Sequence, residues 1–213
     1  MSAKAALALA SKSRCLPDKQ GNRTLFAARG FRICGFAAMC WIALGLESIL
    51  RPQQANYRDA VWMVLRVLTA IAFWLIHRIQ RSPVAWLERA GFYAVMIASV
   101  LVLLGNVGLL ANQPALAIFG FPWGAMLWTV ALIVFGVGTL KAGILPQSAR
   151  IALMLLEPGS ILMGLALSPV APLHERGAYS GGVEKGVVLA LISFGLLSVR
   201  SIRYDESAPP AAS

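Results

Sequence analysis

The chain has little charge and few of the residue types that carry catalysis. Of its 213 residues, 13% are charged and 58% are hydrophobic, whereas soluble domains have about a quarter charged and about half apolar residues. No HExxH, GxSxG or Walker sequence occurs in it, and these motifs mark common metal, serine and phosphate sites. A soluble core cannot take up this much apolar surface. The composition therefore excludes a soluble globular fold and favours a protein that is not an enzyme.

Histidine and cysteine are also too scarce and too scattered to build a cofactor site. The two histidines, His77 and His174, lie in a helix end and in a link, so a bis-histidine haem site within a membrane is excluded. The three cysteines are Cys15, Cys34 and Cys40, and they form no CxxC pair. We therefore expect no metal and no cofactor.

Apolar residues are grouped in six runs, each close to the length of about 20 residues that crosses a bilayer as a helix. Proline, glycine and basic residues separate the runs. The sequence thus predicts an all-α fold, a polytopic membrane bundle of six transmembrane helices within residues 31–203. The expected spans are 31–50, 60–79, 90–111, 116–140, 149–167 and 183–199.

The two ends of the chain are polar. Residues 1–30 are basic and rich in Ala and Ser, a composition typical of a cytoplasmic tail before a first span and also of an organellar transit peptide. We favour the tail, because the run 31–50 is too long for the apolar core of a signal peptide. Residues 204–213 predict a disordered tail.

Basic residues are distributed unequally over the two sides of the predicted spans. Fourteen fall on the side of the termini and four on the opposite side. The positive-inside rule therefore places both termini in the cytoplasm. The same distribution explains the net charge of +10 by membrane orientation, and no nucleic-acid partner is expected.

Three ionisable residues stand out within the predicted spans, where charges are costly and face a partner or water. Glu47 and Arg66 belong to neighbouring spans, and the short link between these spans favours an ion pair that joins the two helices. An anion site at Arg66 is the alternative. Glu157 lies about 12 Å from the cytoplasmic end of its span, which leaves about 9 Å of depth between it and Arg66.

The span 149–167 is interrupted directly after this carboxylate by Pro158 and Gly159. Proline removes a backbone donor inside a helix, and the chain bends there. The pattern fits a proton or cation site, and it also fits a kinked packing helix with a protonated or water-facing Glu157. Both interpretations stay open at this point.

Small and amide residues mark further positions within the spans. The pairs Gly120/Gly124 and Gly182/Gly186 fit the small-xxx-small pattern, which predicts close helix packing within the bundle or between two copies of the chain. Asn106 is a further polar side chain at membrane depth. Gly120 and Gly124 also flank a proline, so a kink or an interfacial first turn is expected near the start of the span 116–140.

The segment FGVGTLKAGILPQSARIALMLLEPGS resembles a hairpin of uncharacterised bacterial polytopic inner-membrane proteins. Those proteins have a glycine-bearing helix, a basic residue, an Ala/Ser-Gly-x-Leu-Pro turn and a second apolar helix. The matching residues are Gly136, Lys141, Ala142, Gly143, Leu145 and Pro146. The resemblance implies a membrane-embedded architecture and a bacterial inner-membrane location, and it implies no activity.

Two functions follow as hypotheses. The first is a structural or accessory subunit of a membrane assembly, with the lipid bilayer and other membrane subunits or a second copy as partners. The alternative is a small transporter that uses the intramembrane carboxylate Glu157 together with Arg66.

Overall fold

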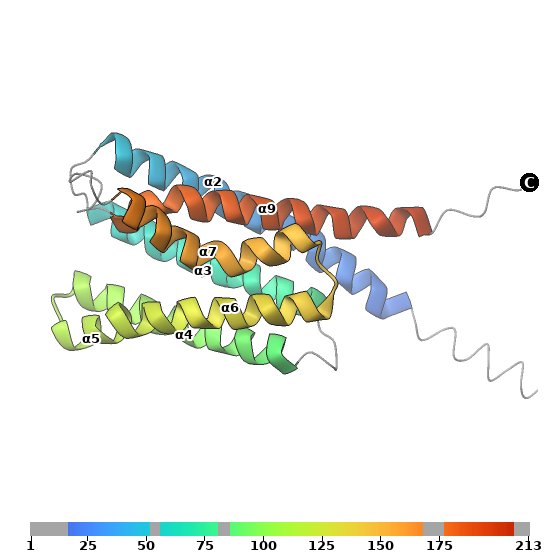
Figure 1. The fold of residues 1–213 in the computed structure, drawn as a ribbon, viewed down its shortest axis with the longest axis horizontal. Helices are drawn as coiled ribbons and strands as arrows, with labels where there is room; N and C mark the ends of the chain where they lie inside the picture. The colour runs from blue at the N-terminus through green and yellow to red at the C-terminus, as the bar shows by residue number, and fades with distance from the viewer. Residues whose placement is uncertain (1–16, 52–55, 81–85, 168–176, 207–213) are drawn as a thin grey trace, which may run out of the picture.

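The computed structural model describes residues 17–51, 56–80, 86–167 and 177–206, and its regular elements are helices (Figure 1). They are α2 (Pro17–Leu50), α3 (Asn56–Gln80), α4 (Trp86–Leu110), α5 (Pro114–Ile118), the π-helix η1 (Phe119–Gly124), α6 (Ala125–Ala142), α7 (Gln147–Leu167) and α9 (Gly177–Glu206).

The long helices lie side by side and alternate in direction. Helices α2, α4 and α7 run toward one end of the bundle, and α3, α6 and α9 run back, so the start of α2 and the end of α9 lie at the same end (Figure 1). Helix α9 packs on α2 and α7, and α6 packs on α4 and α7. The all-helical prediction is confirmed for the described residues.

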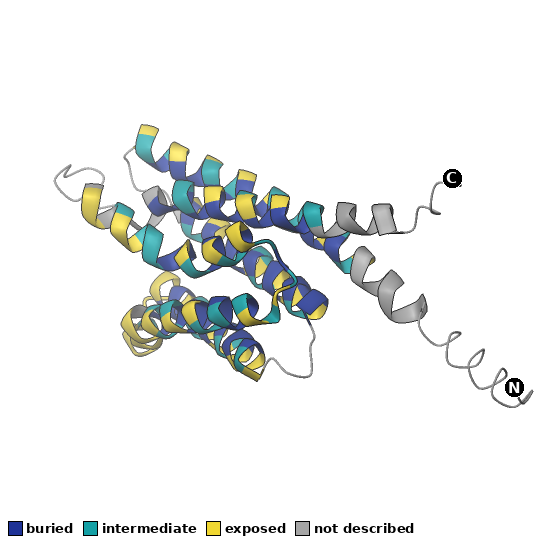
Figure 2. Ribbon diagram, turned by 45° about the vertical axis from the view of Figure 1, so that its right-hand side comes forward, coloured by how far each residue is buried: buried dark blue, intermediate teal, exposed yellow. Residues whose placement is uncertain are grey.

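Five helices are long and apolar enough to cross a membrane. The segments that meet this description are Leu25–Leu50, Tyr57–Gln80, Trp86–Leu110, Pro114–Ala142 and Gly181–Ser198. Large hydrophobic side chains are exposed on the outer faces of the bundle (Figure 2). Such helices are those of a multi-pass integral membrane protein. The remaining predicted span, 149–167, corresponds to α7, and the count of six stays a prediction.

Helices α2 and α9 extend furthest beyond the predicted spans. Helix α2 begins at Pro17, fourteen residues before the predicted start of the first span. Proline is favoured in the first turn of a helix, where no partner for its missing N–H is needed. Helix α9 begins at Gly177 rather than at residue 183 and extends to Glu206, into the predicted disordered tail. Residues 1–16 and 207–213 of the predicted tails lie outside the described residues.

The predicted irregularity near the start of the span 116–140 is a π-helical turn. Helix η1 contains Pro122 between Gly120 and Gly124, and α6 continues from it. Helix α6 ends at Ala142, and the residue that caps it, Gly143, has a left-handed φ of 71°, which suits a residue without a side chain.

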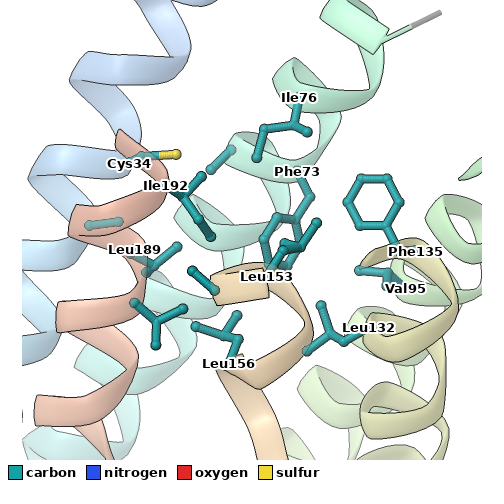
Figure 3. Packing of buried hydrophobic residues seen from close by; sticks show 14 of the residues in the cluster. Cys34, Phe73, Ile76, Val95, Leu132, Phe135, Leu153, Leu156, Leu189 and Ile192 are labelled. Carbon is teal, nitrogen blue, oxygen red and sulfur yellow. The ribbon is translucent and has the colours of Figure 1, made fainter. Parts of the chain in front are cut away.

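The apolar core lies where α2, α3, α6, α7 and α9 meet, and α4 closes one side (Figure 3). Ten of its side chains are labelled in Figure 3: Cys34, Phe73, Ile76, Val95, Leu132, Phe135, Leu153, Leu156, Leu189 and Ile192. Leu153 and Leu156 of α7 point from the middle of the bundle toward these neighbours. Glu157, which follows Leu156 in α7, is also buried.

Candidate functional site

Glu157 lies inside the bundle between two cationic side chains. Lys185 Nζ donates a hydrogen bond to Glu157 Oε1 at 3.3 Å and lies 3.2 Å from Oε2. Arg66 Nη2 lies 3.7 Å from the same Oε2, and Trp128 Nε1 donates a hydrogen bond to it at 3.0 Å. We call Arg66, Glu157 and Lys185 the ion cluster. Its side chains are 6%, 12% and 7% exposed, so the two positive charges and the one negative charge face one another away from solvent.

Aromatic rings cover the two cations of the ion cluster. The guanidinium carbon of Arg66 lies 4.7 Å from the ring centre of Trp62 and 4.4 Å from that of Trp128. Lys185 Nζ lies 5.5 Å from the ring of Trp41. Tryptophan faces attract cations most strongly where water is excluded. The rings therefore stabilise the positive charge that exceeds the single carboxylate of Glu157.

The depths of the residues explain why Glu157 and Arg66 meet. Helix α3 begins at Asn56 and α7 at Gln147, so each residue lies ten positions from its helix start, or about 15 Å. The two helices start at opposite ends of the bundle (Figure 1). Two depths of about 15 Å together span a hydrocarbon core of about 30 Å. The predicted separation of 9 Å is therefore wrong, because both helices begin earlier than the spans expected from hydropathy.

Glu47 does not pair with Arg66, contrary to the expectation from the short link. Its Oε2 lies 2.6 Å from Arg58 Nε, and its Oε1 accepts hydrogen bonds from Tyr57 at 2.6 Å and from Arg58 Nη2 at 2.7 Å. Arg58 Nη2 also donates to the carbonyl of Arg51. Because α3 begins four residues earlier than expected, Arg58 is a helical residue directly across from Glu47. The pair joins the end of α2 to the start of α3.

Lys185 is the functional residue that the sequence interpretation missed. The expected span began at residue 183, and Lys185, only two residues inside it, was counted with the basic residues of the outer side. In the structure, α9 begins at Gly177, and Lys185 lies eight residues into it. The sequence does hold a signal: a glutamate and a lysine, Glu184 and Lys185, stand at the start of an apolar run with glycines on both sides.

The helix break after Glu157 forms a close contact with α9. Helix α7 is bent in Figure 1, and Pro158 lies inside it. An added Cβ at Gly159 would overlap the carboxylate of Glu184, and one at Gly181 would overlap the hydroxyl of Ser160. Glu184 Oε2 is buried and has no hydrogen-bond partner. A second carboxylate thus lies beside the ion cluster, at the point where α7 bends.

The remaining predicted residues lie elsewhere in the bundle. Asn106 is buried in α4 and donates a long hydrogen bond of 3.5 Å to the carbonyl of Asp59. Gly182 and Gly186 bring α9 against the backbone of α2. Gly120 faces Gly105 of α4, and Gly124 faces Val102. The glycines of both pairs therefore allow close helix contact within the chain.

Another buried acid lies near the end of the bundle opposite to Glu47. Glu88, fully buried near the start of α4, lies 2.8 Å from His77 Nδ1 of α3.

Among the residues that the structure describes, no three His, Cys, Asp or Glu side chains gather where a metal could bind. The ion cluster can therefore hold helices together, or pass a proton between Lys185 and Glu157 across one hydrogen bond.

No protein-family model, curated protein or solved structure matches the chain. The resemblance to bacterial inner-membrane proteins therefore stays a prediction, and functional inference depends on the geometry given above.

Proposed function

We propose that this integral membrane protein is a structural or accessory subunit of a membrane assembly and has no catalytic activity. The observation that supports this role is that both carboxylate oxygens of Glu157 already have partners within the bundle. Two cations and one indole N–H surround its carboxylate, and neither of the two surface cavities described for the bundle is lined by it. A charge held this way joins α3, α6, α7 and α9.

We further propose that both termini are cytoplasmic and that the protein resides in a bacterial inner membrane. The excess of basic residues on the side of the termini supports this orientation. The partners proposed for the outward apolar faces are lipid and other membrane subunits or a second copy of the chain. Nucleic acid is not among them.

A transporter is the second candidate, and one specific observation favours it. The unpartnered oxygen of Glu184 lies beside the bend at Pro158 and the ion cluster. Broken helices with buried ionisable groups form the ion sites of many transporters. In this function Glu157 would exchange a proton or a cation as α7 moves relative to α9.

One experiment separates the two functions. Wild type, Glu157→Gln and the control Glu47→Gln are reconstituted in vesicles, and proton flux is recorded together with the size of the complex extracted in mild detergent. The structural role predicts that wild type shows no proton flux and is extracted as a complex larger than the 22.8 kDa chain. It also predicts that Glu157→Gln disrupts this complex. Flux in wild type that Glu157→Gln abolishes without loss of folding would establish transport instead.

A further inference from the structure

A cavity of about 540 Å³ lies between α3 and α4, near the end of the bundle that carries the start of α2. Its lining residues are Trp74, His77, Arg78, Arg89, Phe92, Tyr93 and Met96. We call it the α3–α4 pocket. Tyr93 is 61% exposed and Trp74 39% exposed, so the pocket opens on the outer face of the bundle.

The polarity of the α3–α4 pocket changes with depth. Arg78 lies two residues from the end of α3 and Arg89 three residues from the start of α4, which is about 3–5 Å from the helix ends. Phe92 and Tyr93 lie about 9–10 Å from the start of α4, and Met96 about 15 Å. The shallow end is therefore cationic, and the deep end is aromatic and apolar.

Contacts within the pocket hold its polar end in place. His77 binds the buried carboxylate of Glu88 at 2.8 Å, and its ring stacks on Phe92 with 4.1 Å between ring centres. The guanidinium of Arg78 lies 5.1 Å from the ring centre of Trp74. Groups that are ordered before binding lose less entropy when a ligand arrives.

We propose that the α3–α4 pocket binds an anionic glycerophospholipid. The phosphate contacts Arg78 and Arg89, and the first part of an acyl chain lies over Phe92 toward Met96. Guanidinium groups form strong charge-assisted bonds with phosphate oxygens. An amphiphile matches the gradient from charge to apolar surface, whereas a free phosphate would leave the deep end of the pocket empty. The opening on the outer face gives access from the bilayer.

The second cavity provides an internal contrast. It has a volume of about 440 Å³ near the opposite end of the bundle, and no charged residue lines it. It is lined by Gly108, Leu109, Asn112, Gln113, Pro114, Ala117 and Ile118. Of these two cavities, the preference for anionic lipid is therefore assigned to the α3–α4 pocket.

The test uses the full chain, purified in a nonionic detergent and titrated with phosphatidylglycerol, phosphatidylcholine or glycerol 1-phosphate, with the bound fraction read by native mass spectrometry. Phosphatidylglycerol is expected to bind at least about tenfold more tightly than phosphatidylcholine. The double variant Arg78→Gln/Arg89→Gln should weaken phosphatidylglycerol binding by about tenfold or more. The control Arg29→Gln/Arg32→Gln removes two exposed arginines of α2 and should leave it unchanged.

A second pair of variants tests the acyl-chain end. Met96→Trp fills the deep end and keeps both arginines, so phosphatidylglycerol binding should fall about fivefold or more. Val100→Trp, at an exposed position of α4, should have no effect. Equal losses in the two arginine double variants would show attraction to surface charge and overturn the proposal. Competition by glycerol 1-phosphate at equal concentration would identify a free-phosphate site and also overturn it.

If the arginine double variant does not fold, the single variants Arg78→Gln and Arg89→Gln take its place. Unchanged phosphatidylglycerol binding in both would contradict the assignment of the phosphate. Reduced binding in both would support it. None of these outcomes depends on the ion cluster, so the lipid site and the proposed structural role stand or fall separately.

Discussion

Helices α3, α7 and α9 meet around buried charges, whereas α4 meets α5, η1 and α6 along glycines. In the first region, Arg66 and Lys185 both pair with Glu157 in the middle of the bundle. In the second, which we call the glycine seam, an added Cβ at Gly105 of α4 or Gly120 of η1 would overlap the backbone of the facing helix. Lipid tails are as apolar as leucine, so burial of apolar surface gives little drive for helices to associate inside a bilayer.

The two regions gain specificity in different ways. A buried charge is very unfavourable without its partners, so the ion cluster fixes which helices must be neighbours. Glycine seams gain energy through close van der Waals contact of backbones and depend on shape alone. The first region should therefore respond to a change of charge at constant volume, and the second to a single added methyl group.

The largest expected effect is the loss of the carboxylate in Glu157→Ala. Arg66 and Lys185 would then remain buried without their counter-charge, and we expect the free energy of unfolding to fall by about 3–5 kcal/mol. Equilibrium unfolding in mixed micelles with increasing SDS measures this difference. The matched control is Glu47→Ala, whose carboxylate lies at a helix end and is 27% exposed; its effect should be clearly smaller.

A triple variant tests whether this loss of stability comes from the unbalanced buried charge. Replacing Arg66 and Lys185 by methionine in the Glu157→Leu background removes all three charges and keeps apolar volume in place. Part of the lost stability should return, because apolar replacements of whole buried ion groups are often tolerated. If the triple variant is as unstable as Glu157→Ala, shape rather than charge balance holds this region together, and the contrast with the glycine seam fails.

An intermediate effect is expected for Gly105→Ala in the glycine seam. The new Cβ would overlap the backbone of Gly120, and forced separation of packed helices costs about 1–3 kcal/mol. The control Gly35→Ala places a Cβ 3.3 Å from the hydroxyl of Ser193, which can give way. The same SDS titration compares the two. Equal stability of both variants would show that the close contact at Gly105 carries no energy.

The fold was largely predictable from hydropathy, because apolar runs of near-membrane length are its strongest signal. Five of the runs correspond to helices that can cross a membrane. The helix ends were less predictable. Helix α9 continues through Gly181 and Gly182, because close contact with α2 and α7 compensates for the weak helix propensity of glycine. Nothing local in the sequence indicates that contact.

The ion cluster was predictable in part. The sequence singled out Glu157 and Arg66, because charges within apolar runs are rare and costly. Their partners depend on depth, and an error of a few residues at a helix start moves a side chain by several ångströms. That error assigned Arg66 to Glu47 and placed Lys185 at the outer edge of its span. The pairing of His77 with Glu88 depends likewise on how α3 and α4 face each other.

The smallest expected effect belongs to a single hydrogen bond within the ion cluster. Trp128→Phe removes the N–H that binds Glu157 Oε2 at 3.0 Å and keeps an aromatic ring over Arg66. We expect a loss of about 1 kcal/mol, because hydrogen bonds to charged groups exceed the average of about 0.6 kcal/mol measured between membrane helices. Trp41→Phe is the matched control, because it removes a 3.1 Å bond to the neutral hydroxyl of Thr69. A larger loss for Trp41→Phe than for Trp128→Phe would mean that the charge of Glu157 adds nothing to the bond, and the two regions of the bundle would then differ only in shape.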